Sequence, residues 1–269
     1  MTADQARQPD EAGRRSPDEA DRYSRAALSI LTEPGDAVLG ALLRSVPPKE
    51  ILDIVMSECP DPGSVLGRVR EGDGGPGAEK NSGGIVSRAV ADRAIERWRA
   101  RRRDVPPPGR LELWEQAGFR IVCPEEPEWP TQLDDLGDAR PVALWLSGTT
   151  NLRFACLHSV SVVGSRAATA YGSHVATELS AELAGLGWTV ISGGAFGVDA
   201  CAHRGALAVG GCTVAVLASG LSFGYPRSNS DLFAAIAHTG VMVSECPPDR
   251  APTRPGFLVR NRVIAALSR

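Results

Sequence analysis

The chain of 269 residues is long enough for one large domain or two ordinary ones. Hydrophobic residues make up 43% of the chain and charged residues 23%, as in globular proteins. No apolar run of about 18 residues occurs, so we expect no membrane span and no secretory signal, and therefore a cytoplasmic location. The net charge of −3 does not indicate a polyanionic partner, but residues 159–269 carry eight Arg against six acidic residues, which permits contact with nucleic acid.

The first part of the sequence predicts helices. Residues 1–22 are polar with mixed charge and are expected to form a disordered tail. From Tyr23, apolar residues recur at helical spacing with breaks at "EPGD" and "VPPKE", which predicts three short helices with Asp36 as the N-cap of the second. A flexible insert over 60–84, rich in Gly and Pro, precedes a further amphipathic helix that ends in "ERWRARRR". Residues 23–105 are therefore predicted to form a helical N-terminal domain.

The rest of the sequence predicts a parallel sheet. Residues 106–158 have the pattern of helix, strand, turn, helix and strand, and we interpret them as a connecting segment that leads into the sheet. Over 159–269, the apolar stretches "SVSVVG", "TVISGG", "TVAVLASG" and "VMVSE" alternate with amphipathic helices. This alternation is typical of right-handed βαβ units, so the predicted fold class is α/β, a Rossmann-like parallel sheet with flanking helices. Because the chain ends on a helix, we expect this domain to be incomplete.

The unusual residues all follow predicted strands, and in a parallel sheet such loops share one rim where ligands bind. The first loop is Gly164-Ser165-Arg166. Its hydroxyl, backbone amides and guanidinium suit a phosphate, and the alternative is a tight turn with a solvent-exposed arginine. The loop lacks the further glycines of a dinucleotide fingerprint and the lysine of a Walker A loop.

The second loop is "GGAFGVD". Gly193, Gly194 and Gly197 indicate a backbone that comes close to another group, such as a phosphate held in a backbone nest. Phe196 either stacks on a base or folds into the core. His203, in the helix that follows, is either a structural histidine or a general base.

The remaining two loops contribute six candidates, which are Tyr225, Arg227, Asn229, Arg260, Asn261 and Arg262. Two arginines near a helix start oppose the helix dipole unless an anion lies between them, and the alternative is that they bond to Glu245 or to loop carbonyls. No nucleophile–base set and no cluster of metal ligands is evident, and the six cysteines form no CxxC pair. We therefore expect free thiols, no cofactor, no metal and no catalysis.

In order and spacing, these stretches resemble the DNA-processing protein A family (DprA, also called Smf). The resemblance runs from about Tyr23 to Arg269 and rests on "SVVGSRAATAYG", "ISGGAFGVDACAHRGAL", "GGCTVAVLASGL", "YPRSN", "VSECPP" and "FLVRNRVIAALS". It implies a small helical, SAM-like domain ahead of the Rossmann-like one, binding of single-stranded DNA, loading of the RecA recombinase in transformation or recombination, and a possible homodimer. It also places Arg166 and Arg227 in the DNA pocket and implies further strands beyond residue 269.

The resulting hypothesis is a non-enzymatic protein that binds single-stranded DNA along the rim and does not act at a membrane. The rival hypotheses are a nucleotide-processing enzyme like the phosphoribohydrolases of the Rossmann group, although their PGGxGTxxE signature is absent, and a truncated remnant without activity. The predicted DNA-binding residues are Gly164, Ser165, Arg166, Gly193, Gly194, Phe196, Gly197, His203, Tyr225, Arg227, Asn229, Arg260, Asn261 and Arg262.

Overall fold

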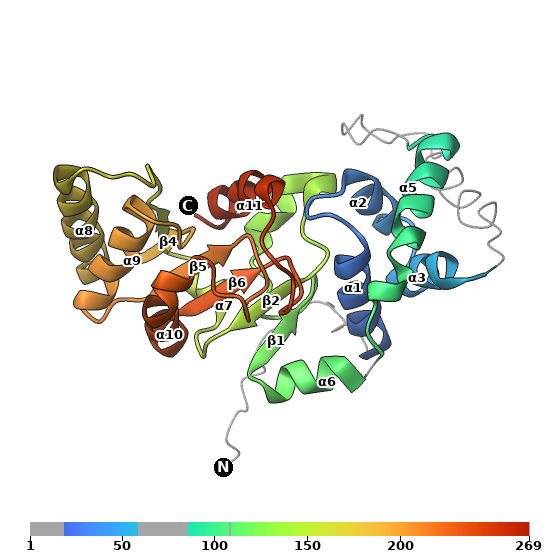
Figure 1. Cartoon of the computed structure of the whole chain (residues 1–269), viewed down its shortest axis with the longest axis horizontal. Helices are drawn as coiled ribbons and strands as arrows, with labels where there is room; N and C mark the ends of the chain where they lie inside the picture. The colour runs from blue at the N-terminus through green and yellow to red at the C-terminus, as the bar shows by residue number, and fades with distance from the viewer. Residues whose placement is uncertain (1–18, 59–85, 108, 269) are drawn as a thin grey trace, which may run out of the picture.

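The structure, a computed structural model, describes residues 19–58, 86–107 and 109–268. The predicted insert over 60–84 and most of the predicted tail lie outside these residues. A cluster of N-terminal helices occupies one end of the molecule, and a sheet with helices on both faces forms the rest (Figure 1). Helices α5 and α8 lie at opposite ends of the longest axis.

The N-terminal helices pack around a hydrophobic cluster of their own. They are α1 (Glu19–Leu31), α2 (Ala37–Leu43), α3 (Pro48–Met56) and α5 (Arg88–Ala100), and the 3-10 turn η1 (Arg102–Asp104) follows them. Leu28, Leu31, Leu39 and Trp98 are at most 2% exposed in this cluster. Helix α1 begins four residues before Tyr23, because the acidic residues of its first turn favour a helix start, so the predicted tail was too long by these four residues.

Asp36 is the N-cap of α2, as predicted. Its carboxylate accepts hydrogen bonds from the amides of Val38 at 3.0 Å and Leu39 at 3.3 Å. The other carboxylate oxygen accepts from Trp98 Nε1 at 3.1 Å. One side chain thus caps α2 and joins it to α5.

The sheet has six strands in the order β1-β2-β6-β5-β4-β3. The strands are β1 (Phe119–Val122), β2 (Leu144–Ser147), β3 (Ser159–Ser161), β4 (Thr189–Ser192), β5 (Thr213–Leu217) and β6 (Val241–Ser244). Strands β3 to β6 are parallel and pair in chain order, which confirms the predicted Rossmann-like parallel sheet. Strand β2 pairs antiparallel with both β1 and β6, so the segment predicted to connect the halves extends the same sheet by two strands.

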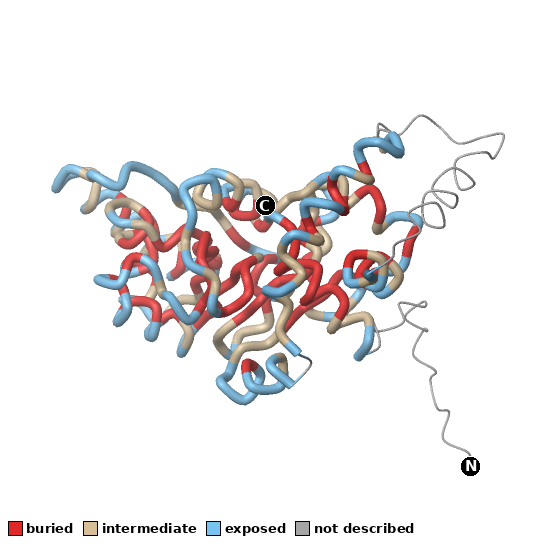
Figure 2. Tube along the Cα trace, turned by 45° about the vertical axis from the view of Figure 1, so that its right-hand side comes forward, coloured by how far each residue is buried: buried red, intermediate tan, exposed pale blue. Residues whose placement is uncertain are grey.

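Both faces of the sheet are covered, and the buried residues concentrate along its strands (Figure 2). The elements on one face are η2 (Thr131–Ala139), α7 (Leu152–Ala155) and α11 (Arg254–Leu267), and those on the other are α1, α6 (Gly109–Gln116), α9 (Val198–Ala208) and α10 (Ser230–Thr239). Alternate residues of β5 serve the two faces, because Val214 packs with Ile264 of α11 and Ala215 packs with Phe233 of α10. Helix α8 (Ala170–Gly185) packs on α9 at the end of the sheet.

Candidate nucleic-acid interface

The loop after β3 presents an exposed arginine beside free backbone amides. Ser165 fixes the loop, because its carbonyl accepts from the amide of Val198 and its hydroxyl accepts from the amide of Ala167, both at 3.1 Å. In the part of the chain that the structure describes, the amides of Gly164, Ser165 and Arg166 donate to no protein acceptor. The loop can therefore offer an anion both amide donors and a planar cation.

A cavity of about 400 Å³ opens beside this loop, between β3, the loop after β4 and the first turns of α11. The guanidinium carbon of Arg166 lies 4.7 Å from the ring centroid of Phe257, which lines the same cavity. Asn261 also lines it and is exposed. Aromatic, amide and cationic groups around one cavity suit a nucleotide better than a purely apolar ligand.

The glycines of the second loop make room for other parts of the protein. Gly197 has φ +72° and ψ −127°, and a Cβ there would overlap the carbonyl oxygen of Ser165. A Cβ at Gly193 would overlap the guanidinium of Arg260, and one at Gly194, where φ is +67°, would lie 2.8 Å from the ring of Phe233. Gly193 and Gly194 are buried and make room for Arg260 and Phe233, and their contact with a bound phosphate stays a prediction.

Arg260 is a structural residue. Its side chain is turned inward, where Nη1 donates to the carbonyl of Gly193 at 2.6 Å and also to the carbonyl of Val216. The pKa of Arg260 is lowered to about 10, chiefly by burial; the charge of Asp199 opposes this shift and the charge of Arg166 adds to it. The expectation of an arginine pair at a helix start fails because α11 begins at Arg254, which puts Arg260 in the second turn.

Arg262 is also turned inward. Its Nη2 donates to Glu245 Oε2 at 2.6 Å, which realises the alternative pairing considered for this arginine. The same guanidinium packs against the turn between α1 and α2, where a Cβ added at Gly35 would come within 2.7 Å of its Nε. Arg262 therefore joins the helical cluster to the loop after β6.

His203 and Asn229 are buried as well. His203 is fully buried, and its Nδ1 lies 2.7 Å from Thr213 Oγ1. Because Thr213 donates its own proton to the carbonyl of Val190 at 2.6 Å, His203 Nδ1 is the donor to Thr213. The pKa of His203 is lowered to about 3, chiefly by burial and further by the charges of Arg260 and Arg204. The amide nitrogen of Asn229 donates to the carbonyl of Gly194 at 3.1 Å, so Asn229 joins the third loop to the second.

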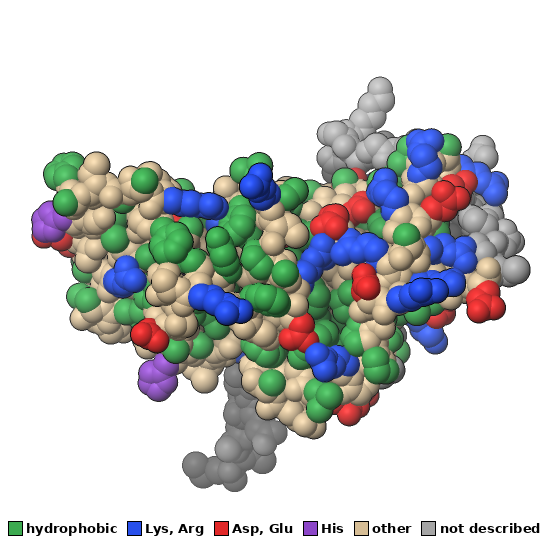
Figure 3. Space-filling view, viewed as in Figure 1, with side chains coloured by type: hydrophobic (Ala, Val, Ile, Leu, Met, Phe, Trp, Pro, Cys, Tyr) green, Lys and Arg blue, Asp and Glu red, His purple; other side chains and the backbone are tan. Residues whose placement is uncertain are grey.

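Other predicted side chains remain on the surface of the rim. Phe196 is 47% exposed and Tyr225 is 43% exposed, and Arg227 lies two residues after Tyr225 in η3 (Arg227–Asn229), also exposed. Together with Arg166, they place two cations and two aromatic rings on the exposed loops after β3, β4 and β5. Figure 3 shows arginines spread over one face of the molecule, with hydrophobic side chains between them.

The sequence analysis missed Phe257. Its ring contacts Arg166 and lies 5.7 Å from the ring of Tyr225, so it joins the first and third loops. A signal was present, because Phe257, Arg260 and Ile264 lie at helical spacing on one face of α11. Periodicity alone assigns this whole face of α11 to the core. It does not show that the end of the face that carries Phe257 is only partly buried and lines the rim cavity.

Within the described residues, no group of three or more His, Cys, Asp or Glu side chains could hold a metal ion. The cysteines in those ranges are free, and Cys59 lies outside them. None of the described helices is both long and apolar enough to cross a membrane.

Comparison with known proteins finds one family. The family model described as DNA recombination-mediator protein A matches residues 120–269. A DNA processing protein DprA from Mycobacterium tuberculosis is 38% identical over 255 residues, which is 91% of this chain and 58% of that protein. The DNA processing protein DprA of Bacillus subtilis is 32% identical over 158 residues, which is 59% of this chain and 52% of the relative. The chain thus spans less than two thirds of the length of these relatives.

Solved structures agree with these sequence matches. The X-ray structure of DNA processing protein A from Streptococcus pneumoniae superposes with a TM-score of 0.63 at 26% identity, over 92% of this chain and 75% of that one. The protein of the same name from Helicobacter pylori, whose structure is described as showing a single-stranded DNA binding mode, superposes with a TM-score of 0.50 at 34% identity. That match covers 56% of this chain and 66% of the other.

Proposed function

This chain belongs to the DNA recombination-mediator protein A family, and we propose that it binds single-stranded DNA along the loops that follow β3 to β6. The observation that carries the proposal is that Arg166, the unpaired amides of its loop and the ring of Phe257 meet at one cavity, with the ring of Tyr225 beside that of Phe257. Phosphates need cations and amide donors, whereas unpaired bases need exposed rings. The rim offers both.

The proposed contact set is smaller than the one expected from the sequence. It comprises Gly164, Ser165, Arg166, Phe196, Gly197, Tyr225, Arg227, Asn261 and Phe257. The buried residues of the rim act by holding the loops in place. Two exposed arginines in place of four predict moderate affinity with a shallow salt dependence.

The biological role is proposed from family membership. We propose that the bound DNA serves recombination or transformation in the cytoplasm, that the protein helps to load the RecA recombinase, and that it can form a homodimer. We propose binding as its role instead of catalysis. His203, the histidine of this loop region, supports this view because its burial keeps it neutral and away from any substrate.

Fluorescence anisotropy with labelled oligothymidylate of about 20 nucleotides tests the proposal. The double variant Arg166→Ala/Arg227→Ala should bind at least about tenfold more weakly, because it loses two charge-assisted phosphate contacts. The matched control is Arg153→Ala/Arg204→Ala, which removes two arginines outside the rim and outside residues 88–104 and should bind as wild type. Equal affinity of both double variants would overturn the proposal, and release of free base from AMP would favour the nucleotide-processing enzyme.

A further inference from the structure

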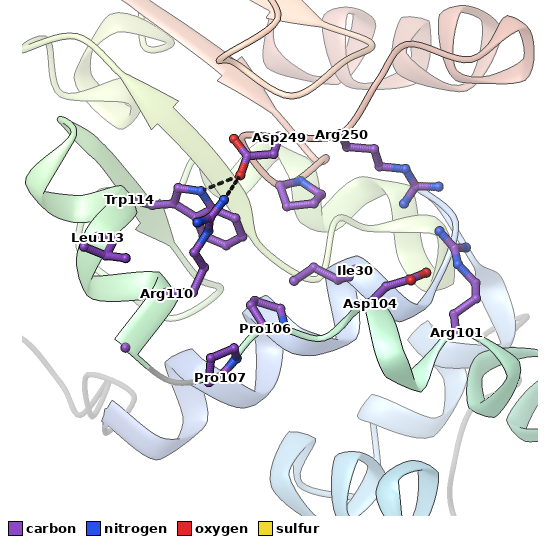
Figure 4. A pocket seen from close by; sticks show the side chains of 12 residues that line it. Ile30, Arg101, Asp104, Pro106, Pro107, Arg110, Leu113, Trp114, Asp249 and Arg250 are labelled. Carbon is purple, nitrogen blue, oxygen red and sulfur yellow. Dashed lines mark hydrogen bonds and ion pairs between the residues drawn. The ribbon is translucent and has the colours of Figure 1, made fainter.

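A second and larger cavity, of about 700 Å³, lies away from the rim cavity. It opens where α1, the segment after η1, the start of α6 and the loop after β6 meet (Figure 4). Its size falls in the range of small-molecule sites, and neither the predicted site nor the proposed contact set uses it.

The walls of this cavity are apolar and fixed. Leu113 is 54% exposed at its mouth, and Pro106 and Pro107 form the facing wall. Trp114 is held in orientation because its Nε1 donates to Asp249 Oδ2 at 3.1 Å. An exposed leucine beside a fixed indole and two prolines provides surfaces on which a flat ring can pack.

Arginines stand at both ends of the cavity. Arg110 bonds to Asp249 at 2.6 Å, and Arg101 and Arg250 share Glu33 at 2.6 and 2.7 Å. Arg101 and Arg110 each use one nitrogen in these bonds, so other donors of each guanidinium remain available.

The surface beside the cavity is strongly basic. Residues 88–104, which form α5 and η1, contain seven arginines against three acidic residues. In the described ranges, Arg102 and Arg103 of η1 form no ion pair. This charge balance suits a polyanion better than a peptide of mixed charge.

One loop separates the two cavities. Pro247, Asp249 and Arg250 line the larger cavity, and the same loop continues into α11, where Phe257 lines the rim cavity. The loop is anchored because the carbonyl of Arg250 accepts from the amide of Gly220 at 2.7 Å. A strand that runs from the rim to the larger cavity would cross this anchored loop.

We propose that the larger cavity is a second nucleotide subsite for the same DNA strand, an inference that rests on the proposed function. An unpaired base packs between Leu113 and the proline wall, and the flanking phosphates contact Arg101 and Arg110. A duplex does not satisfy this site, because its bases are stacked and paired and cannot enter an apolar cavity. The subsite extends the footprint of the DNA from the sheet edge to the N-terminal helices.

Oligothymidylates of about 5 and about 20 nucleotides separate the two sites, because only the longer one can occupy both. Leu113→Glu and Arg110→Ala should each weaken binding of the longer oligonucleotide by about tenfold and leave the shorter one unchanged. Leu157→Glu is the matched control. Leu157 is 53% exposed, a fraction similar to that of Leu113, but it directly precedes β3, at the amino end of that strand, whereas the rim loops follow the carboxyl ends of the strands. A thermal melt of each variant verifies that the fold is intact.

The outcomes distinguish the two proposals. If wild type binds neither oligonucleotide, the proposed function itself fails. If wild type binds both but the two cavity variants match Leu157→Glu on the longer oligonucleotide, the rim proposal stands and the second subsite is overturned, which assigns the cavity to another occupant such as a peptide.

Discussion

Replacing Gly197 by alanine tests the geometry that holds the Arg166 loop. The added methyl would overlap the carbonyl oxygen of Ser165 and come within 2.7 Å of that of Arg166. Both atoms belong to backbone, so no side-chain rotation relieves the contact. The backbone at Gly197, with φ +72° and ψ −127°, is also one that alanine adopts only under strain.

The magnitude follows from two separate costs. Strain at such a dihedral pair costs about 1–3 kcal/mol, and forcing a methyl against packed backbone costs about 1–3 kcal/mol more. Gly197→Ala should therefore lower the free energy of unfolding by about 2–6 kcal/mol. Because the methyl pushes on the Arg166 loop, affinity for single-stranded DNA should fall as well.

Two other glycines serve as controls in the same urea unfolding series. Gly210 has φ +71° but open space around it, so Gly210→Ala should cost only about 1 kcal/mol. Gly185 ends helix α8 with an ordinary φ and open space, so Gly185→Ala should stabilise by about 0.5–1 kcal/mol. If Gly197→Ala costs no more than Gly210→Ala, the close approach of the two loops is refuted.

Three further predictions concern charge. The pKa of His203 is lowered to about 3 in the folded chain, so below pH 6.5, its ordinary pKa, the unfolded chain takes up a proton that the folded chain does not. The contribution of His203 to the free energy of unfolding should be fully present above pH 6.5 and fall by about 1.4 kcal/mol per pH unit below it. Urea unfolding of His203→Gln should lack this pH dependence. The slope of log affinity against log salt concentration, measured in anisotropy titrations, should become shallower by about 0.7 in Arg166→Ala and stay unchanged in Arg204→Ala. Equal slopes in the two variants would count against a phosphate contact at Arg166. Arg262→Met should lower the free energy of unfolding in urea by about 3–5 kcal/mol, because it leaves the buried carboxylate of Glu245 without its partner. The double variant Arg262→Met/Glu245→Gln should recover most of this loss. If Arg262→Met is as stable as wild type, the pair is not buried.

The parallel part of the fold follows from the sequence because its strands are short, apolar and separated by helices. The packed face of α8 was harder to infer, since apolar spacing favours Val175 and Leu179, yet Ala176 and Ser180 are the residues that are buried. The reason is the close approach of α9, where a Cβ at Gly205 would overlap the backbone of α8. Small residues allow that approach, and hydrophobicity alone does not reveal it.

The candidate site was predictable in position and only partly in its members. Strand order alone brings the four loops to one edge, so the place of Arg166 and Tyr225 follows from topology. The direction of a long side chain does not follow from topology. Arg260 and Arg166 look equivalent in the sequence, but the carbonyls left free around Gly193 draw Arg260 inward. Such carbonyls become visible only after the loops are placed.

Photocrosslinking of an oligonucleotide that contains bromodeoxyuridine, followed by peptide mapping, tests the central claim most directly. If single-stranded DNA lies on the rim, the crosslinked peptides should include those that carry Phe196, Tyr225 or Phe257, and excess unlabelled single-stranded DNA should abolish the crosslinks. Crosslinks confined to residues at the amino ends of the parallel strands, such as Leu157, would contradict the account.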